Sequence, residues 1–224
     1  MRAAFAARIY QDGGFGPIRV REPIILGHEI AGTVEAVGHG VTRVAPGDRV
    51  AFDPSRPCGH CKYCVEKLFQ HCLAMRFYGS AMRFPHEQGA FRDRIIAHDF
   101  QCEKVGNETS IAQAACAEPL AVCLHAANRA GDLMGKRVLV TGAGPIGSLC
   151  VAVAHQRGAS EIVVTDLQDT MLEAAMRMGA TRTINVAENA AAMDDYSADK
   201  GYFDICFECS AARAAIRDAI TDRR

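Results

Sequence analysis

The chain has 224 residues, of which 49% are hydrophobic and 23% charged, enough for one large domain or two modest ones with a buried core. Its 25 Lys and Arg against 26 Asp and Glu give a formal net charge of −1, so no strong field attracts nucleic acid or an anionic membrane. We expect neither partner, and no apolar run is long enough for a transmembrane helix. Residues 1–8 lack the apolar core of a secretory signal, which predicts a cytoplasmic protein with reduced thiols.

The first half of the chain consists of short apolar segments separated by Gly and Pro. This pattern predicts β-strands at residues 29–37, 48–52 and 91–97. Residues 112–130 are rich in alanine and predict a helix, which Pro119 is expected to break or kink. We interpret this helix as a connector between two lobes.

The second half alternates strands and helices. Four short apolar strands are predicted at residues 137–141, 161–165, 182–186 and 203–207, and two helices at residues 146–157 and 170–178. Continuous apolar strands alternating with helices are typical of a doubly wound α/β domain, in which helices cover both faces of a parallel sheet.

A glycine pattern joins the first of these strands to its helix. Gly142, Gly144 and Gly147 form G-x-G-x-x-G, with Pro145 and Ile146 between the last two glycines. A strand before the pattern and a helix after it predict a site for the pyrophosphate of a dinucleotide. Asp166 comes 19 residues after Gly147, where an acid accepts from ribose hydroxyls and repels a 2′-phosphate, which favours NAD over NADP. The alternative interpretation is that the glycines only let the helix pack on the strand, and that Asp166 only caps the following turn.

Four cysteines follow the spacing C-x2-C-x2-C-x7-C, at Cys58, Cys61, Cys64 and Cys72. Four thiolates so close in sequence predict a closed tetrahedral Zn²⁺ site that contributes to folding. An iron–sulfur cluster and four free thiols are the alternatives. We interpret the remaining cysteines as small core residues, although Cys116 or Cys123 could serve as a further metal ligand.

His28 and Glu29 follow Gly27 at the entry to the first predicted strand. Together they can bind zinc and leave a position open for a substrate oxygen. By themselves, such pairs are more often hydrogen-bonded side chains without a metal.

Four features together resemble the zinc-dependent medium-chain alcohol and polyol dehydrogenases: residues 27–29, the four cysteines, residues 118–122 and the glycine turn. Residues 118–125 resemble the sorbitol dehydrogenase branch of this family, and so does the glutamate Glu29 after His28 in the segment 27–29. Several stretches resemble its L-idonate 5-dehydrogenase subfamily, namely residues 13–16, 54–58, 77–82 and 118–129.

The resemblance implies a GroES-like catalytic domain at residues 1–110 and a Rossmann domain at residues 111–224. It implies a catalytic zinc held by His28 and Glu29 and approached by Glu118, a structural zinc on the four cysteines, and NAD on the glycine turn. The expected reaction oxidises a secondary hydroxyl of a sugar acid or polyol, such as L-idonate, sorbitol or xylitol, to a ketone. Full-length members of the family are expected to be homo-oligomers.

The sequence departs from the family at two places. No cysteine precedes Cys58, and the family's first zinc ligand would fall near Ala3. The second half supplies about four strands, where a doubly wound dinucleotide domain has six. We therefore expect a chain that is incomplete at both ends and has little turnover. An inert zinc-binding and nucleotide-binding fragment or pseudo-enzyme is the alternative. Arg76, Arg83 or Arg92 could pair with a substrate carboxylate, or each could be a solvated surface residue.

Overall fold

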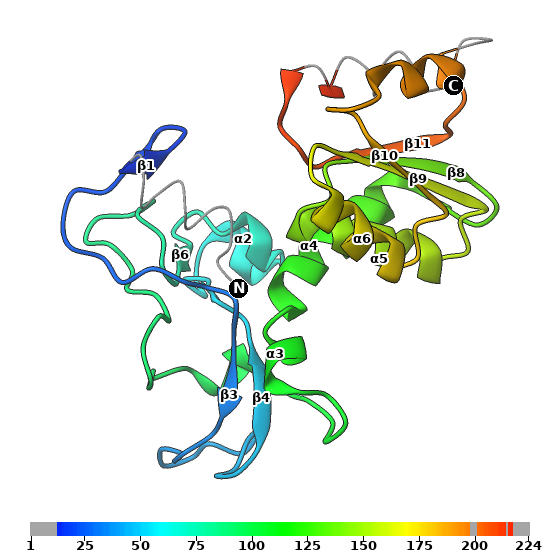
Figure 1. Cartoon of the computed structure of the whole chain (residues 1–224). Coiled ribbons are helices and arrows are strands. Elements are labelled where there is room, and N and C mark those ends of the chain that lie inside the picture. The colour runs from blue at the N-terminus through cyan, green and yellow to red at the C-terminus, as the bar shows by residue number, and fades with distance from the viewer. Residues whose placement is uncertain (1–12, 198–200, 214, 217–224) are drawn as a thin grey trace. The chain divides into compact units, whose positions relative to one another are not determined.

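The computed structural model describes residues 13–197, 201–213 and 215–216, which divide into two units between Glu118 and Pro119 (Figure 1). Each unit is considered by itself. None of the helices within the described ranges is both long and apolar enough to cross a membrane.

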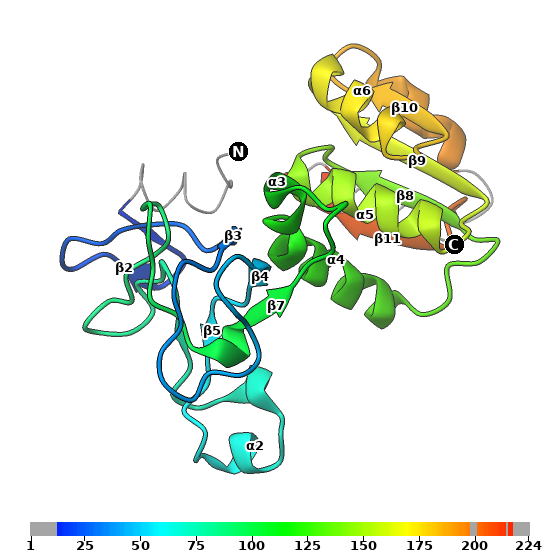
Figure 2. The ribbon, with the colours of Figure 1, turned by 90° about the horizontal axis from the view of Figure 1, so that it is seen from below.

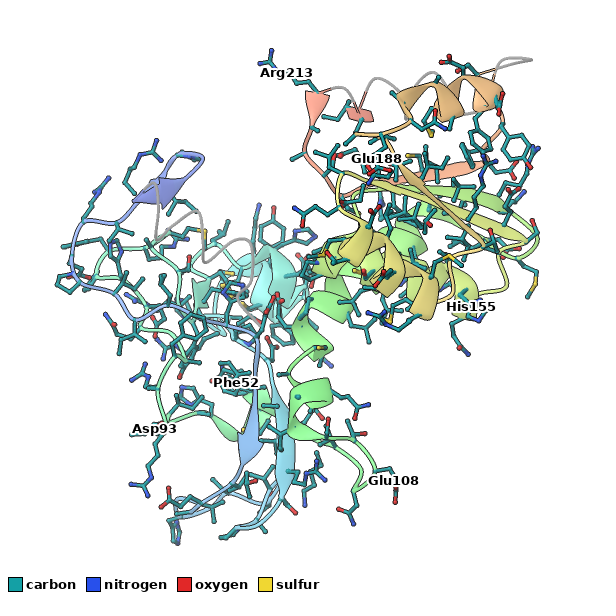
Figure 3. All side chains as sticks on the ribbon, viewed as in Figure 1. Phe52, Asp93, Glu108, His155, Glu188 and Arg213 are labelled. Carbon is teal, nitrogen blue, oxygen red and sulfur yellow. The ribbon has the colours of Figure 1, made fainter. Side chains whose placement is uncertain are left out.

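The first unit is built on a three-stranded antiparallel sheet in the order β3-β4-β7. Its strands are β3 (Ile30–Thr33), β4 (Arg49–Phe52) and β7 (Cys102–Lys104), and two antiparallel pairs are β1 (Gly14–Phe15) with β2 (Ile18–Arg19) and β5 (Ser55–Arg56) with β6 (Arg76–Phe77). Short helical segments are α2 (Lys62–Val65), η1 (Phe69–His71), η2 (Asp99–Gln101) and α3 (Ile111–Ala114). Phe52, labelled in Figure 3, is buried and packs its ring edge-on against Tyr78 at 5.1 Å.

The second unit is a four-stranded parallel sheet in the order β10-β9-β8-β11. The strands are β8 (Arg137–Thr141), β9 (Glu161–Asp166), β10 (Arg182–Asn185) and β11 (Ile205–Glu208), and the helices are α4 (Ala117–Ala130), α5 (Pro145–Gln156), α6 (Asp169–Arg177) and the 3-10 helix η3 (Ala190–Tyr196). Figures 1 and 2 both show α5 and α6 on the same face of this sheet. The predicted doubly wound α/β fold is confirmed.

Side chains alternate between two buried layers along these strands. Val138 and Val140 pack with residues of α4, α5 and α6, whereas Leu139 packs on the opposite face with Met193 and Tyr196 of η3. All three β8 side chains are fully buried. A strand covered on both faces reads as a continuous apolar run, which is why its sequence predicted a parallel strand.

Most predicted elements are confirmed with shifted ends, and two predictions need correction. Residues 91–97 form no strand: Phe91 and Ile96 are exposed, and the Phe91 N–H bonds the Leu26 carbonyl without a ladder following it. The helix expected at residues 112–130 is interrupted, but before Pro119, which lies in the first turn of α4. A proline is tolerated there because the first helical N–H groups have no partner within the helix.

Candidate functional site

The four cysteines of the predicted metal lobe converge. Their sulfur atoms all lie within 4.8 Å of one another. Cys64 Sγ is 3.6 Å from Cys61 Sγ and 4.0 Å from Cys58 Sγ. Four thiolates around Zn²⁺, with Zn–S bonds of about 2.3 Å, form a tetrahedron with edges of about 3.8 Å. The spacing fits a single ion, whereas an iron–sulfur cluster places several irons between its thiolates and needs wider separation.

Backbone N–H groups prepare two of these sulfurs to be thiolates. The N–H groups of Leu73 and Cys64 lower the pKa of Cys61 to about 6. The Cys58 N–H lies 3.2 Å from Cys72 Sγ and lowers the pKa of that thiol. Burial has the opposite effect on Cys64, whose pKa rises to about 12. Metal binding requires deprotonated sulfur, so Cys64 must release a proton as an ion enters.

The turn that carries His28 is held by close backbone packing. Gly27 has φ +99°, and a Cβ there would lie 2.4 Å from the Phe91 ring. A Cβ on Gly79 would lie 2.7 Å from the Gly27 carbonyl oxygen, and one on Gly89 would lie 2.5 Å from Leu26. Sequence reasoning missed both distant glycines, because only the fold brings them beside the turn.

His28 and Glu29 are half-buried in the segment directly before β3. Burial lowers the pKa of His28, which favours the neutral imidazole that a metal requires. The His28 ring also meets the Phe77 ring edge-on, with centroids 5.3 Å apart. Burial raises the pKa of Glu29. The turn therefore presents a neutral nitrogen donor beside a carboxyl group.

Glu118 lies in the first turn of α4, where the charges of Glu29 and Asp53 act on its carboxyl group. Burial raises its pKa, and the negative charges of Glu29 and Asp53 raise it further. Among the described residues, however, the four cysteines are the only group of three or more metal-ligating side chains whose donor atoms converge. His28, Glu29 and Glu118 do not complete a second group, and the position near Ala3 lies outside the described residues.

The glycine-rich turn leaves β8 and enters α5. Gly142 has φ +87°, and a Cβ on it would meet the Ser210 backbone nitrogen at 2.9 Å. A Cβ on Gly147 would lie 1.8 Å from the Gly142 carbonyl oxygen, whereas a Cβ on Gly144 would meet nothing within 4 Å. The turn lies at the carboxyl end of β8, where the strand order switches from β9 on one side to β11 on the other. Ligands of doubly wound sheets bind at such switch points.

Asp166 ends β9 beside this turn. Its carboxylate accepts from the backbone N–H of Ala143 at 2.7 Å, of Leu167 at 2.7 Å and of Gln168 at 3.0 Å. The side chain therefore links the second strand to the glycine turn as well as capping its own turn. Whether it also binds a ribose stays a prediction.

The three arginines considered for substrate binding have partners within the first unit. Arg76 pairs with Glu87 at 2.9 Å, and Arg83 donates to backbone carbonyls of residues 73 and 75. Arg92 uses its Nε to bond the Gly89 carbonyl at 2.8 Å. A substrate carboxylate would compete with Glu87 for Arg76, whereas the terminal nitrogens of Arg92 remain outside that bond.

Two family models match the chain. The alcohol dehydrogenase GroES-like domain matches residues 6–107, and the zinc-binding dehydrogenase domain matches residues 145–221. The chain belongs to the zinc-dependent medium-chain alcohol and polyol dehydrogenases. This confirms the family, the GroES-like first unit and the Rossmann-type second unit that the sequence motifs predicted.

Individual dehydrogenases of this family are similar over nearly the whole chain. L-idonate 5-dehydrogenase (NAD(P)(+)) of Escherichia coli K-12 is 41% identical over 94% of this chain and 60% of its own length. Sorbitol dehydrogenase of Bacillus subtilis 168 is 36% identical over 96% of this chain and 60% of its own length. The crystal structure of L-idonate 5-dehydrogenase from E. coli K-12 matches with a TM-score of 0.91 and 39% identity, covering 100% of this chain and 63% of that one. The chain thus spans about 60% of the length of these relatives.

Proposed function

We propose that this protein is an NAD-dependent zinc oxidoreductase of the cytoplasm that oxidises a secondary hydroxyl of a sugar acid or polyol to a ketone. The observation that carries the proposal is the glycine turn at the switch point of the parallel sheet, open above Gly144 and closed around Gly147. Relatives named for L-idonate and sorbitol support this substrate class. L-idonate is the first substrate to test, and we propose that the protein acts as a homo-oligomer.

Each part of the candidate site has a proposed role. Backbone N–H groups at the start of α5 bind the cofactor pyrophosphate, and Asp166 receives the adenosine ribose. The four cysteines hold a structural zinc. His28 and Glu29 offer a nitrogen and an oxygen ligand to a catalytic zinc, and Glu118 is assigned the role of approaching that ion or a water beside it. A zinc there supplies Lewis-acid polarisation of the substrate oxygen.

A second candidate function is an inert protein that binds zinc and nucleotide. One observation favours it: within the ranges that the structure covers, His28, Glu29 and Glu118 do not converge on a third ligand atom as the four cysteines do. On this alternative, only the cysteine lobe takes a metal.

One preparation distinguishes the two candidates. Zinc per chain is counted by elemental mass spectrometry, and NADH formation is followed with L-idonate and with sorbitol. The dehydrogenase proposal expects two zinc ions and slow NADH formation, in keeping with the little turnover expected from the sequence. His28→Ala should abolish this NADH formation, whereas His39→Ala, at an exposed histidine of the same unit, should leave it unchanged. One zinc with NADH binding and no turnover would establish the inert protein. A chain that binds no NADH would refute both candidates.

A further inference from the structure

Three cysteines of the second unit meet next to the glycine turn. Cys123 lies on α4, Cys150 on α5, and Cys209 directly after β11. The first two are 1% and 3% exposed, and Cys209 is partly exposed at the edge of the same core. The Cys150 thiol interacts with the thiols of both neighbours. None of the three has a role in the proposed dehydrogenase chemistry.

The backbone places Cys209 beside the first turn of α5. Its N–H bonds the Thr141 carbonyl at 2.8 Å, which fixes it beside the end of β8. A Cβ on Gly147 would lie 3.6 Å from the Cys209 Cβ. Cys150 comes one helical turn after Gly147, and residues three apart on a helix are surface neighbours. Cys209 therefore packs against the same core as Cys150, beside the turn of α5 that precedes it, and the two thiols interact.

Cys206 provides a contrast within the same strand. It lies three residues before Cys209 on β11 but packs against the layer on the other face of the sheet, with Leu139 and Phe203. Proximity in sequence therefore does not decide which thiols meet.

We propose that Cys209 and Cys150 are a peroxide-sensitive pair that forms a disulfide beside the glycine turn. The sulfur of Cys209 attacks one oxygen of hydrogen peroxide, the O–O bond breaks, and Cys209 becomes a sulfenic acid with release of water. The sulfur of Cys150 then displaces the sulfenic hydroxyl, which leaves as water with the Cys150 proton. Two electrons pass from the two sulfurs to the peroxide, which is reduced to two waters.

Exposure and protonation give the order of these steps. Cys209 is the most accessible of the three thiols to a solute. The Cys123 thiol acts to lower the pKa of Cys150, but the Cys209 thiol and burial outweigh it and raise that pKa to about 12. Cys150 thus keeps its proton at neutral pH and acts second, as the resolving thiol.

The disulfide would act on the phosphate-binding turn, and this consequence rests on the proposed function. The backbone of residues 209–210 lies against Gly142, where an added Cβ would be 2.9–3.0 Å away. Drawing the two sulfurs together to a bond of about 2.05 Å would pull this backbone toward α5. Because residues 209–210 pack closely against Gly142, we expect their displacement to distort the glycine turn and NADH affinity to fall about tenfold.

The test oxidises the reduced, zinc-loaded full chain with hydrogen peroxide, alkylates the remaining thiols and maps peptides without reduction. We expect a Cys150–Cys209 linked peptide that dithiothreitol removes, its absence in Cys209→Ser, and its presence in the control Cys206→Ser. Recovery of both cysteines as alkylated peptides, or of Cys209 linked elsewhere, would overturn the proposal. The peptide map of the wild-type chain alone decides whether the Cys150–Cys209 disulfide forms, so this test does not depend on whether the variants fold.

NADH titration of the reduced and oxidised chains then tests the effect on the turn. A roughly tenfold weaker affinity after oxidation, restored by dithiothreitol, supports it. Equal affinity in a fully linked chain refutes it. A reduced chain that binds no NADH counts against the proposed function instead, while the peptide map still decides whether the thiol pair reacts.

Discussion

Replacing Gly147 by alanine should destabilise the second unit because of one backbone contact. A Cβ at this position would lie 1.8 Å from the Gly142 carbonyl oxygen, and Cβ atoms essentially never come closer than 3.0 Å to such an atom. The turn and α5 must therefore separate by at least about 1.2 Å. Overpacking of this kind costs about 1–3 kcal/mol, and about 1 kcal/mol returns through the better helix propensity of alanine. The upper end applies, since both sides are backbone, so we expect a net loss of about 2 kcal/mol.

Gly144→Ala is the matched control within the same turn. Gly144 has φ −62° and ψ −175°, which alanine adopts without strain, and an added Cβ meets nothing within 4 Å. Stability should stay the same or rise by about 0.4–1 kcal/mol. The new methyl group nevertheless occupies the space through which a pyrophosphate approaches the turn, so NADH affinity should fall roughly 10- to 100-fold.

Urea unfolding followed by circular dichroism, together with NADH fluorescence titration, separates the two effects. Gly147→Ala should lose unfolding free energy, whereas Gly144→Ala should lose NADH binding without losing stability. A Gly147→Ala chain as stable as the wild type would refute the packing argument. A Gly144→Ala chain that binds NADH normally would refute the placement of the pyrophosphate.

Three further predictions concern other contacts. Cys64→Ser should remove zinc from the cysteine lobe, whereas Val65→Ser, at an exposed neighbour, should retain it; elemental mass spectrometry counts the zinc, and equal content would contradict the site. Asp166→Ala should weaken NADH binding roughly tenfold and reduce the preference for NADH over NADPH. Titration with both nucleotides checks this, and an unchanged ratio of the two affinities would rule out a role of Asp166 in ribose binding. The Lys104 hydrogen bond lowers the pKa of Asp48, so its stabilisation is present above the unfolded pKa of about 3.9 and is lost as pH falls through the folded value. Asp48→Asn should therefore be less stable than the wild type at neutral pH and equally stable in acid. Urea unfolding of both proteins at the two pH values measures this, and the same difference in unfolding free energy at both would contradict it.

The second unit could be predicted well because its signals are local. The central strands β8 and β9 contain continuous apolar runs, and the glycine turn lies within six residues between a strand and a helix. The cysteine site is local too, since all four ligands fall between residues 58 and 72. Spacing alone therefore predicted the convergence that the structure shows.

The first unit was harder to predict because its contacts are distant in sequence. Phe91 begins an apolar stretch that predicted a strand, yet its ring covers Gly27 and its backbone makes only a short contact with residues 25–27. Strand β7, three residues long, was missed because Cys102 and Lys104 carry no alternating apolar pattern. In this unit, packing partners rather than periodicity decide which segments pair.

The same distinction explains what the sequence left open at His28. Motif spacing nominated His28, Glu29 and Glu118 but could not show that two of these groups oppose each other electrostatically. In the structure burial raises the pKa of Glu118 and the charge of Glu29 raises it further, so the fold brings together two carboxyl groups that repel when both are ionised. A proton on Glu118 relieves that repulsion, and so does a divalent cation beside the neutral imidazole of His28. Because protonation of Glu118 and binding of the cation compete, zinc occupancy at this site should increase with pH as Glu118 ionises. That dependence would distinguish a metal site from a buried carboxyl pair even in a chain without turnover.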